Sequence, residues 1–404
     1  MRITVTTSGH IPSQWAHSIN IVKHANAFLK LGHDVQILSI ERFLEQKNKN
    51  RIRNIHRFYG IADNIKIKFF KDNTIFYFEE IRPFGLINYL NKITKNNIRR
   101  ISDPERKISE YCKKIGIDIC YCRRARRVVH YNIINKIPTV VEEHTPPDNR
   151  QDIYKMCKLS HSKYFKIFIT TSELLKQNFI DIGVNEDKIL VLQNGVDIES
   201  FQNLPNKNGV RELLGLPESK KIVIYSGSLF PDKGIEHILS VAKNLPKIDF
   251  LLLGGRRKQI EFWIKYAFFK NIKNVRFQGF VENSDIPLYL KAADALIMPY
   301  KTDQKITVMD INTTSPLKLF EYMASKKPII STNIPAISRT ITHGINGLLA
   351  EANDIKELTE HLRIVLEDDK LAENLAKNAY DKVKEFDIKK RCKKIISSLN
   401  NDFN

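Results

Sequence analysis

The stretch from Thr313 to Pro328, TTSPLKLFEYMASKKP, places a cation and a carboxylate at a spacing that could serve ligand binding. Small hydroxyl residues followed by a proline are typical of a helix N-terminus, so we predict a helix that begins near Pro316 with Ser or Thr as its cap. Lys318 and Glu321 lie three residues apart and share one face of this helix. Backbone amides at the helix start, the helix dipole and Lys318 together suit a diphosphate. A surface helix with a solvated lysine and glutamate would give the same pattern.

The residues around this pair indicate how it is positioned. Leu317, Phe320 and Met323 recur at helical spacing and predict a buried face. Lys326-Lys327-Pro328 ends the helix, and the β-branched run PIIST predicts a strand directly after it. The stretch is therefore the helix-to-strand half of an α/β unit.

A second cation follows another predicted strand. KIVIYSG is a short apolar run, and the loop SGSLFPDKGIE leads from it into a helix. This turn places Lys233 at a helix start, near the switch point of a parallel sheet, where such sheets bind ligands. The runs DFLLLGG, NVRFQGFV and ALIMPY predict three further buried strands at regular, helix-separated intervals.

The run Ser315 to Ala324, followed by Lys-Pro-Ile-Ile-Ser, resembles the donor-binding helix of the retaining GT-B glycosyltransferases of family 4. Glu321 falls on the second of two glutamates that the family carries eight positions apart, the one that holds the ribose hydroxyls. The first falls on Thr313, so the chain departs from the family where the transferred sugar is gripped. The resemblance implies donor-binding roles for Gly9, Ser228, Lys233, Gly279, Phe280, Val281, Thr313, Ser315, Pro316, Leu317, Lys318 and Glu321, and catalytic roles for His144, Lys233 and Glu321.

The loop that holds Lys233 departs from the family at one position. The family has an arginine after the glycine and a lysine five residues later, both on the diphosphate. Lys233 matches the lysine, but Ser228 replaces the arginine, which leaves Lys318 or Arg256 to supply the second cation. Gly279-Phe280-Val281 resembles the turn whose main chain meets the nucleobase.

The N-terminal half begins with a predicted βαβ unit: strands over Arg2 to Thr7 and His33 to Ile40, with a helix over Ile19 to Leu31 between them. Gly9 matches the early glycine of GT-B enzymes, but SQWAHS stands where the family has a glycine pair. A G-x-G-x-x-G fingerprint does not occur, which argues against an NAD enzyme.

His144 stands just past the predicted strand IPTVVEEH. A histidine at the carboxyl edge of a strand could orient a sugar hydroxyl or a phosphate, although a lone histidine is more often a structural hydrogen-bonding residue. Its position is similar to that of an active-site histidine in family 4, and we favour the functional interpretation. The run Asn194 to Asp197, NGVD, resembles the segment that closes the first domain of the family.

We therefore predict an α/β protein with two Rossmann-like, doubly wound domains facing a cleft. Residues 1–200 form the acceptor-binding domain and residues 201–385 the nucleotide-sugar-binding domain. A C-terminal helix in 386–404 packs back on the first domain. This architecture is what the resemblance to GT-B enzymes implies, and 404 residues are ample for two domains.

The formal net charge of +20 favours an anionic partner. Residues 41–130 hold 22 Lys and Arg against 10 Asp and Glu, with Arg123, Arg124, Arg126 and Arg127 close together. No nucleic-acid-binding motif accompanies this charge, so we expect no nucleic acid and prefer an anionic membrane surface. A composition that is basic throughout the chain is the competing explanation.

The sequence shows no signal-peptide pattern and no apolar run long enough to span a bilayer. We expect a cytoplasmic protein, with a peripheral position on the inner face of the cytoplasmic membrane as an extension of that expectation. No D-x-D motif occurs, and the five cysteines lack C-x-x-C spacing, so we expect neither a metal nor another cofactor.

These features predict a retaining, metal-independent glycosyltransferase. Its donor would be a nucleotide-sugar, with a UDP-sugar expected, and its acceptor a hydroxyl of a cell-surface glycan or a lipid-linked precursor. Lys233, Lys318 and the amides near Ser315 would stabilise the leaving diphosphate. Two alternatives remain open at this point: a sugar-nucleotide epimerase of the same architecture, and a basic binding protein that has lost catalysis.

Overall fold

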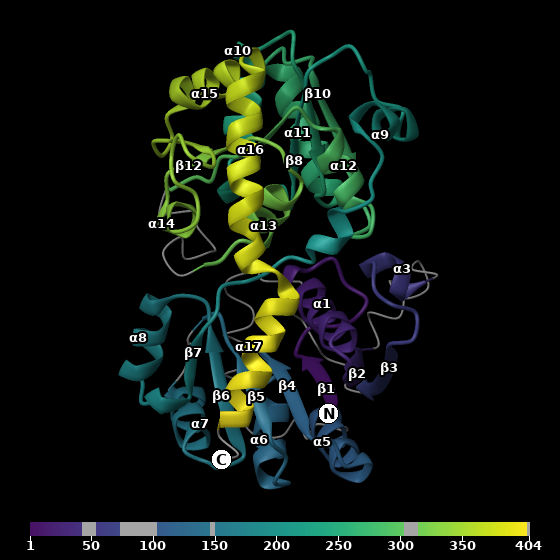
Figure 1. Ribbon diagram of the computed structural model, residues 1–404, viewed down its shortest axis with the longest axis vertical. Coiled ribbons are helices and arrows are strands. Elements are labelled where there is room, and N and C mark those ends of the chain that lie inside the picture. The colour runs from purple at the N-terminus through teal and green to yellow at the C-terminus, as the bar shows by residue number, and fades with distance from the viewer. Residues whose placement is uncertain (43–53, 73–102, 146–149, 303–313, 402–404) are drawn as a thin grey trace, which may run out of the picture. The chain divides into compact units, whose positions relative to one another are not determined.

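The computed structural model describes residues 1–42, 54–72, 103–145, 150–302 and 314–401 (Figure 1). The chain divides into two compact units. The first comprises residues 1–56, 61–143 and 147–168, and the second comprises residues 57–60, 144–146 and 169–404. Each unit is described by itself.

The first sheet has the strand order β3-β2-β1-β4-β5-β6-β7, and the pairs from β3 to β5 are parallel. Its strands are β1 (Arg2–Thr7), β2 (Asp34–Arg42), β3 (Lys66–Asp72), β4 (Ile119–Arg123), β5 (Thr139–Glu142), β6 (Phe165–Thr170) and β7 (Ile189–Val191). All residues of β4 and β5 are buried, as expected for central strands covered on both faces. The chain runs from β1 to β2 on one side, whereas β4 pairs with β1 on the other. Ligands of open α/β sheets bind at the carboxyl ends of strands at such a switch point.

Helices connect these strands. They are α1 (Ala16–Lys30), α3 (Ile55–Tyr59), α5 (Pro104–Ile115), α6 (Arg126–Ile134), α7 (Arg150–Ser160) and α8 (Glu173–Asp181), followed by the 3-10 turns η2 (Glu186–Lys188) and η3 (Ile198–Phe201). Ser172 caps α8, since its Oγ accepts a hydrogen bond from the Leu175 amide at 3.2 Å.

The second sheet is also parallel, with the order β10-β9-β8-β11-β12-β13. Its strands are β8 (Ile222–Ser226), β9 (Asp249–Leu253), β10 (Val275–Gly279), β11 (Ala295–Met298), β12 (Ile329–Thr332) and β13 (Leu348–Ala350). Strand β8 lies between β9 and β11, so the second switch point is at the carboxyl ends of β8 and β11. The predicted strands KIVIYSG, DFLLLGG, NVRFQGFV and ALIMPY are confirmed as β8 to β11.

The helical elements of this part of the chain are α9 (Lys207–Leu214), η4 (Pro231–Lys233), α10 (Ile235–Asn244), α11 (Arg257–Phe269), α12 (Ile286–Ala292), α13 (Leu317–Ala324), α14 (Pro335–Ser338), α15 (Ile355–Glu367), α16 (Asp369–Val383), η5 (Lys384–Phe386) and α17 (Ile388–Asn401). Among the described residues, no helix is both long and apolar enough to cross a bilayer.

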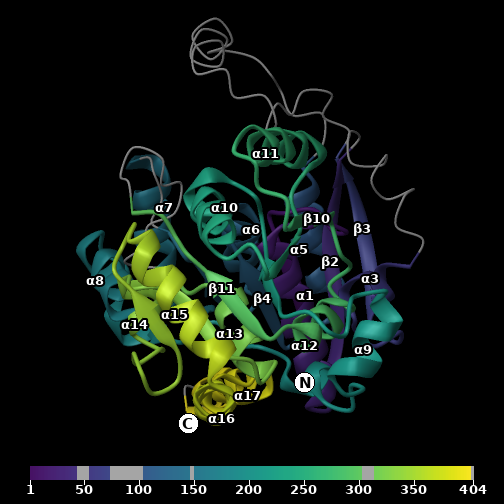
Figure 2. The same cartoon turned by 90° about the horizontal axis from the view of Figure 1, so that it is seen from above.

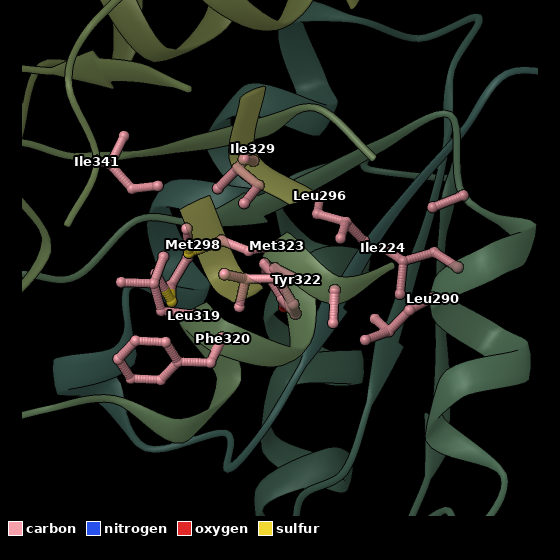
Figure 3. Packing of buried hydrophobic residues seen from close by; sticks show 14 of the residues in the cluster. Ile224, Leu290, Leu296, Met298, Leu319, Phe320, Tyr322, Met323, Ile329 and Ile341 are labelled. Atoms are coloured by element: carbon pink, nitrogen blue, oxygen red, sulfur yellow. The ribbon is translucent and has the colours of Figure 1, made fainter. Parts of the chain in front are cut away.

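Helix α13 is anchored in the core of the second unit. Figure 3 shows Leu319, Phe320, Tyr322 and Met323 of this helix packed among Met298, Leu296 and Ile329 of the adjoining strands. All four helix residues are at most 1% exposed. Lys318 and Glu321 are only partly buried, so the predicted division of the helix into an apolar and a charged side is confirmed.

The predicted helix cap at α13 is wrong. Pro316 occupies the N-cap position itself, and no side chain caps the helix. Ser315 is buried and serves Asn194 instead: its Oγ accepts from the Asn194 amide at 3.1 Å, and its carbonyl accepts from Asn194 Nδ2 at 2.5 Å. The NGVD segment thus fixes the position from which α13 starts.

The boundaries of the two sheets and of the two units differ. The sheets separate between β7 and β8, whereas the units separate within β6. In α17, Arg391 donates to the carbonyls of Gln193 (2.9 Å) and Leu192 (3.4 Å), which follow β7. The predicted divisions at residues 200 and 385, and the packing of the last helix on the first domain, stay predictions.

Candidate functional site

The backbone after β8 passes directly against the ammonium of Lys318. At Gly227 the φ angle is +147°, and a Cβ atom there would lie 2.5 Å from Lys318 Nζ. A φ in this region is one that residues with a side chain rarely adopt, which favours glycine at this position. Lys318 Nζ donates to Tyr225 Oη at 2.9 Å and lies 4.1 Å from the centre of the Tyr225 ring. The lysine that the sequence singled out is therefore held at the switch point of the second sheet.

Lys233 lies near the same site. Its Nζ is 5.2 Å from the ring centre of Tyr300, and Lys318 Nζ is 5.6 Å from that centre. Lys233 also pairs with Asp232 at 2.9 Å. The two ammonium groups thus share one aromatic ring, which cations contact through its negative face.

The electrostatics at Lys318 favour an anionic ligand. Burial lowers the pKa of Lys318 well below its usual value, and the charge of Lys233 lowers it further, while the carboxylates of Glu321 and Asp232 oppose this effect. An anion placed between the two lysines would stabilise both charges. Glu321, the third predicted residue, lies three residues after Lys318 on the same side of α13.

Two buried tyrosines, Tyr225 and Tyr322, hold the loop after β8. Tyr225 Oη donates to the carbonyl of Ser228 at 2.8 Å, and Tyr322 Oη accepts from the Ser226 amide at 2.7 Å. Burial raises the pKa of Tyr225, Tyr300 and Tyr322, so each phenol remains protonated and available as a donor. Ser228 is thus positioned through its main chain.

Glycines bring the neighbouring loops together at the carboxyl edge. A Cβ on Gly254, whose φ is +103°, would lie 2.2 Å from the Gly227 carbonyl oxygen, and the Gly254 amide donates to the Gly279 carbonyl at 2.6 Å. A Cβ on Gly234 would collide with the carbonyl of Pro299 after β11. The loops after β8, β9, β10 and β11 therefore meet backbone to backbone.

The remaining predicted residues of the second unit have mixed placements. Phe280 is 40% exposed and stacks on Phe58, with ring centres 5.5 Å apart, and Val281 is half-buried. His144 is half-buried and follows β5 by two residues. Thr313 lies outside the described residues.

The first unit has a separate charged group at its own switch point. Thr7, Arg123 and Glu142 end β1, β4 and β5 and lie in register as neighbours. Gly9 follows in the loop after β1, where a Cβ would lie 2.1 Å from His17 Nε2. A side chain at position 9 would therefore displace the His17 ring from its present position.

His17 is neutral near physiological pH. Burial lowers its pKa to about 4, and Arg124, Arg123 and His10 add to this effect. A neutral imidazole among cations can hydrogen-bond a hydroxyl without adding charge.

The arginine run of β4 and α6 is more structural than the sequence suggested. Arg123 is buried and lies 3.7 Å from Glu142, and Arg126 contacts both oxygens of buried Glu143, with a nearest approach of 3.2 Å. Arg127 lies 3.0 Å from Asp103. Carboxylates thus balance three of the four arginines that we had assigned to an anionic partner, whereas Arg124 is exposed.

In the described part of the chain, no three His, Cys, Asp or Glu side chains are grouped so that they could hold a metal ion.

A family model described as "Glycosyl transferases group 1" matches residues 206–382, which contain Gly227, Lys233, Lys318 and Glu321. Residues 206–382 thus have the sequence of this family, and the chain is a glycosyltransferase.

Relatives and solved structures agree with this assignment. The glycosyltransferase is 27% identical over 320 residues to UDP-Gal:alpha-D-GlcNAc-diphosphoundecaprenol alpha-1,3-galactosyltransferase of Escherichia coli. This alignment covers 74% of this chain and 80% of the relative. It is 27% identical over 241 residues to N,N'-diacetylbacillosaminyl-diphospho-undecaprenol alpha-1,3-N-acetylgalactosaminyltransferase of Campylobacter jejuni, covering 58% and 60%. Anabaena HepE, solved in complex with UDP and glucose, has a TM-score of 0.71 at 17% identity and covers 99% of this chain and 100% of its own. The predicted GT-B fold is confirmed.

Sequence reasoning missed several residues of the glycosyltransferase site. Tyr225, Tyr300 and Tyr322 sit in apolar strand and helix runs, where an aromatic residue predicts only packing. The Gly254-Gly255 pair after β9 was a usable signal, because adjacent glycines after a strand indicate a close backbone approach. Of the two alternatives for the second cation, Lys318 lies against the loop that contains Ser228.

Proposed function

We propose that this glycosyltransferase transfers a sugar from a UDP-sugar to a hydroxyl of a lipid-linked or cell-surface glycan, with retention at the anomeric carbon and without a metal. The observation that carries the proposal is the pair Lys233 and Lys318 on one ring, Tyr300, against the backbone of Gly227. A diphosphate is the group that two such cations and a glycine loop accommodate.

Each residue has a proposed task in the reaction. The bond between the anomeric carbon and the phosphate oxygen breaks, and the diphosphate leaves with the electron pair. Lys233, Lys318 and the amides at the start of α13 stabilise the charge that develops on it. The acceptor oxygen attacks from the same side, and its proton passes to the departing phosphate oxygen. Glu321 holds the ribose, and His144 holds the transferred sugar or its phosphate.

The choice of substrates rests on what related proteins use. The E. coli relative is named for a UDP-galactose donor and a diphosphoundecaprenol-linked acceptor, and HepE was solved with UDP. We therefore propose a UDP-sugar donor, a lipid-linked acceptor and a peripheral position on the inner face of the cytoplasmic membrane.

Binding of nucleotides to the full chain tests the donor site. We expect UDP to stabilise the protein against heat more than GDP does. Glu321→Ala and Lys233→Ala should each weaken UDP binding by about tenfold or more, because each removes a charged hydrogen-bonding partner. Lys243→Ala, which removes an exposed lysine at the end of α10, is the control. Wild-type affinity in both site variants would remove the site assignment.

Product analysis tests the reaction itself. UDP-sugars are incubated with a polyprenyl-diphosphate-linked sugar, with and without a chelator, and the anomeric configuration of the product is determined. Retained configuration and unchanged turnover under chelation support the mechanism. Conversion of the UDP-sugar without any acceptor would indicate the epimerase alternative.

A further inference from the structure

Four large apolar side chains of α11 are exposed. Phe268 and Phe269 are 80% and 81% exposed, and Phe262 and Ile264 are 58% and 50% exposed. Contiguous apolar groups on a soluble surface mark an interaction site more often than isolated ones do.

The opposite side of α11 fixes the orientation of the helix. Trp263 and Ala267 are buried in the core of the second unit, and Trp263 Nε1 donates to the Leu229 carbonyl at 2.9 Å. At about 100° per residue, this anchor directs Phe262, Lys265 and Phe269 outward together. The exposure of the phenylalanines thus follows from the packing of the helix.

Cations surround these aromatic side chains. Residues 256–273 contain six Lys and Arg and one acidic residue, Glu261, a local excess of +5. Arg257 lies 2.7 Å from Glu261, Lys270 directly follows Phe269, and Lys265 lies three residues from both Phe262 and Phe268. Figure 2 shows α11 at the outer edge of its unit, beyond α10 and β10.

We propose that the exposed face of α11 binds an anionic bilayer surface, with Phe268 and Phe269 entering the interface and Lys265 and Lys270 contacting lipid phosphates. Aromatic side chains favour the level of the headgroups, and basic side chains add attraction to acidic lipids. A second copy of this chain is a poorer partner, because a two-fold contact would place one +5 surface against another. The proposal does not depend on the proposed reaction.

Flotation of the full chain with vesicles tests the proposal, using phosphatidylcholine alone and phosphatidylcholine mixed with phosphatidylglycerol. We expect binding to the anionic vesicles that exceeds binding to the neutral ones. The double variant Phe268→Ser/Phe269→Ser should lose ~tenfold or more of this binding, since two large apolar side chains no longer enter the interface. Lys265→Gln/Lys270→Gln should bind more weakly and with a smaller response to salt.

Matched controls use exposed apolar residues elsewhere. Leu213 in α9 is 69% exposed and Ile134 in α6 is 61% exposed. Leu213→Ser and Ile134→Ser should bind anionic vesicles as the wild type does. Affinity for UDP, measured without vesicles, should be the same in all variants, so that failure of the membrane proposal and failure of the donor site are distinguishable.

Three outcomes would overturn the proposal. One is wild-type vesicle binding by the phenylalanine double variant. Another is equal binding of the wild type to neutral and anionic vesicles, which removes the lipid charge from the explanation. The third is absence of vesicle binding by the wild type. Self-association in the ultracentrifuge or binding of single-stranded RNA through α11 would then identify a different partner for this face.

Discussion

Arg211 is a buried cation and Lys318 a partly buried one in the same unit, and their surroundings differ. Arg211 is 1% exposed, lies 2.6 Å from Asp294 Oδ2, and donates to the carbonyls of Ala292 and Lys220 at 2.9 Å each. Lys318 instead contacts the Tyr225 hydroxyl and two aromatic rings, with the like charge of Lys233 nearby. The N–H groups of Arg211 bind other parts of the protein and stabilise the fold. The charge of Lys318, by contrast, would be stabilised by a bound anion.

The largest expected effect concerns Arg211. Arg211→Ala should lower the free energy of unfolding by ~3–5 kcal/mol, because it removes the buried cation of the Asp294 ion pairs, leaving Lys207 at 2.8 Å, and deprives the carbonyls of Ala292 and Lys220 of their donor. Urea unfolding measures this change. Arg257→Ala removes an exposed ion pair with Glu261 and should change stability by less than ~1 kcal/mol. If Arg211→Ala unfolded at the wild-type urea concentration, the structural role assigned to Arg211 would be wrong.

Lys318 should behave in the opposite way. Lys318→Met keeps the length of the side chain and removes its charge, so UDP affinity should fall by ~10–100-fold, the value of a hydrogen bond to a charged group. The free energy of unfolding should stay the same or rise, because a cation beside Lys233 is replaced by an apolar group. Calorimetry of UDP binding and urea unfolding test both halves, with Lys243→Met as the control. If Lys318→Met lost as much stability as Arg211→Ala, Lys318 would have a structural role like that of Arg211.

Local patterns predicted what depends on neighbours in the sequence. Alternation, β-branched runs and glycines placed β1, β8 to β11 and the charged side of α13, because burial of each element follows its own periodicity. Lys233 and Lys318 could be assigned to one site because Lys233 stands just before a helix and Lys318 lies in the first turn of another, both at the edge of the same sheet. The same rules misplaced the cap of α13, since Ser315 is engaged by Asn194, 121 residues earlier in the chain.

Other features required three-dimensional partners. The arginines after β4 suggested an anionic ligand, yet Glu142 and Glu143 from the adjacent strand balance two of them. Those glutamates were visible in the sequence, but strand order is needed to bring them beside Arg123 and Arg126. Likewise, the apolar run of α11 resembles a core helix until Trp263 fixes which side is buried.

The pH dependence of donor binding is a further test of the difference between Lys318 and Arg211. In the free protein the pKa of Lys318 is lowered well below its usual value, and a bound diphosphate should raise it. Binding therefore takes up a proton between these two pKa values, and affinity should fall with rising pH in that interval by up to ~tenfold per unit. UDP-glucose is the suitable ligand, because a diphosphate esterified at both ends does not titrate near neutral pH.

Calorimetry in two buffers of different ionisation enthalpy measures this proton uptake. Lys318→Met should bind UDP-glucose with an affinity that no longer varies with pH in the same interval. Arg211 is permanently charged and cannot contribute to such a profile. A pH profile in Lys318→Met identical to that of the wild type would assign the titration to another group.

Substitution of Arg124 should have the smallest effect on donor affinity and should selectively weaken binding of the acceptor. It is exposed at the end of β4, beside the buried Arg123, and its φ of +53° is unusual for a residue with a side chain. Arg124→Ala should leave UDP affinity within ~twofold of wild type and raise KM for the acceptor by ~3–10-fold. Loss of its charge should also raise the pKa of His17 toward the ordinary value, which NMR titration can follow.

Arg124→Gly separates the charge from the backbone. Glycine adopts this φ without strain, whereas alanine does not, so the two variants should differ in stability. Because both lack the guanidinium, they should lose acceptor affinity equally if the charge is what matters. A normal KM in Arg124→Gly together with a raised KM in Arg124→Ala would instead assign the effect to the backbone at the end of β4. Arg124 would then belong with Arg211, as a residue that shapes the protein, and the first unit would need another group to meet its acceptor.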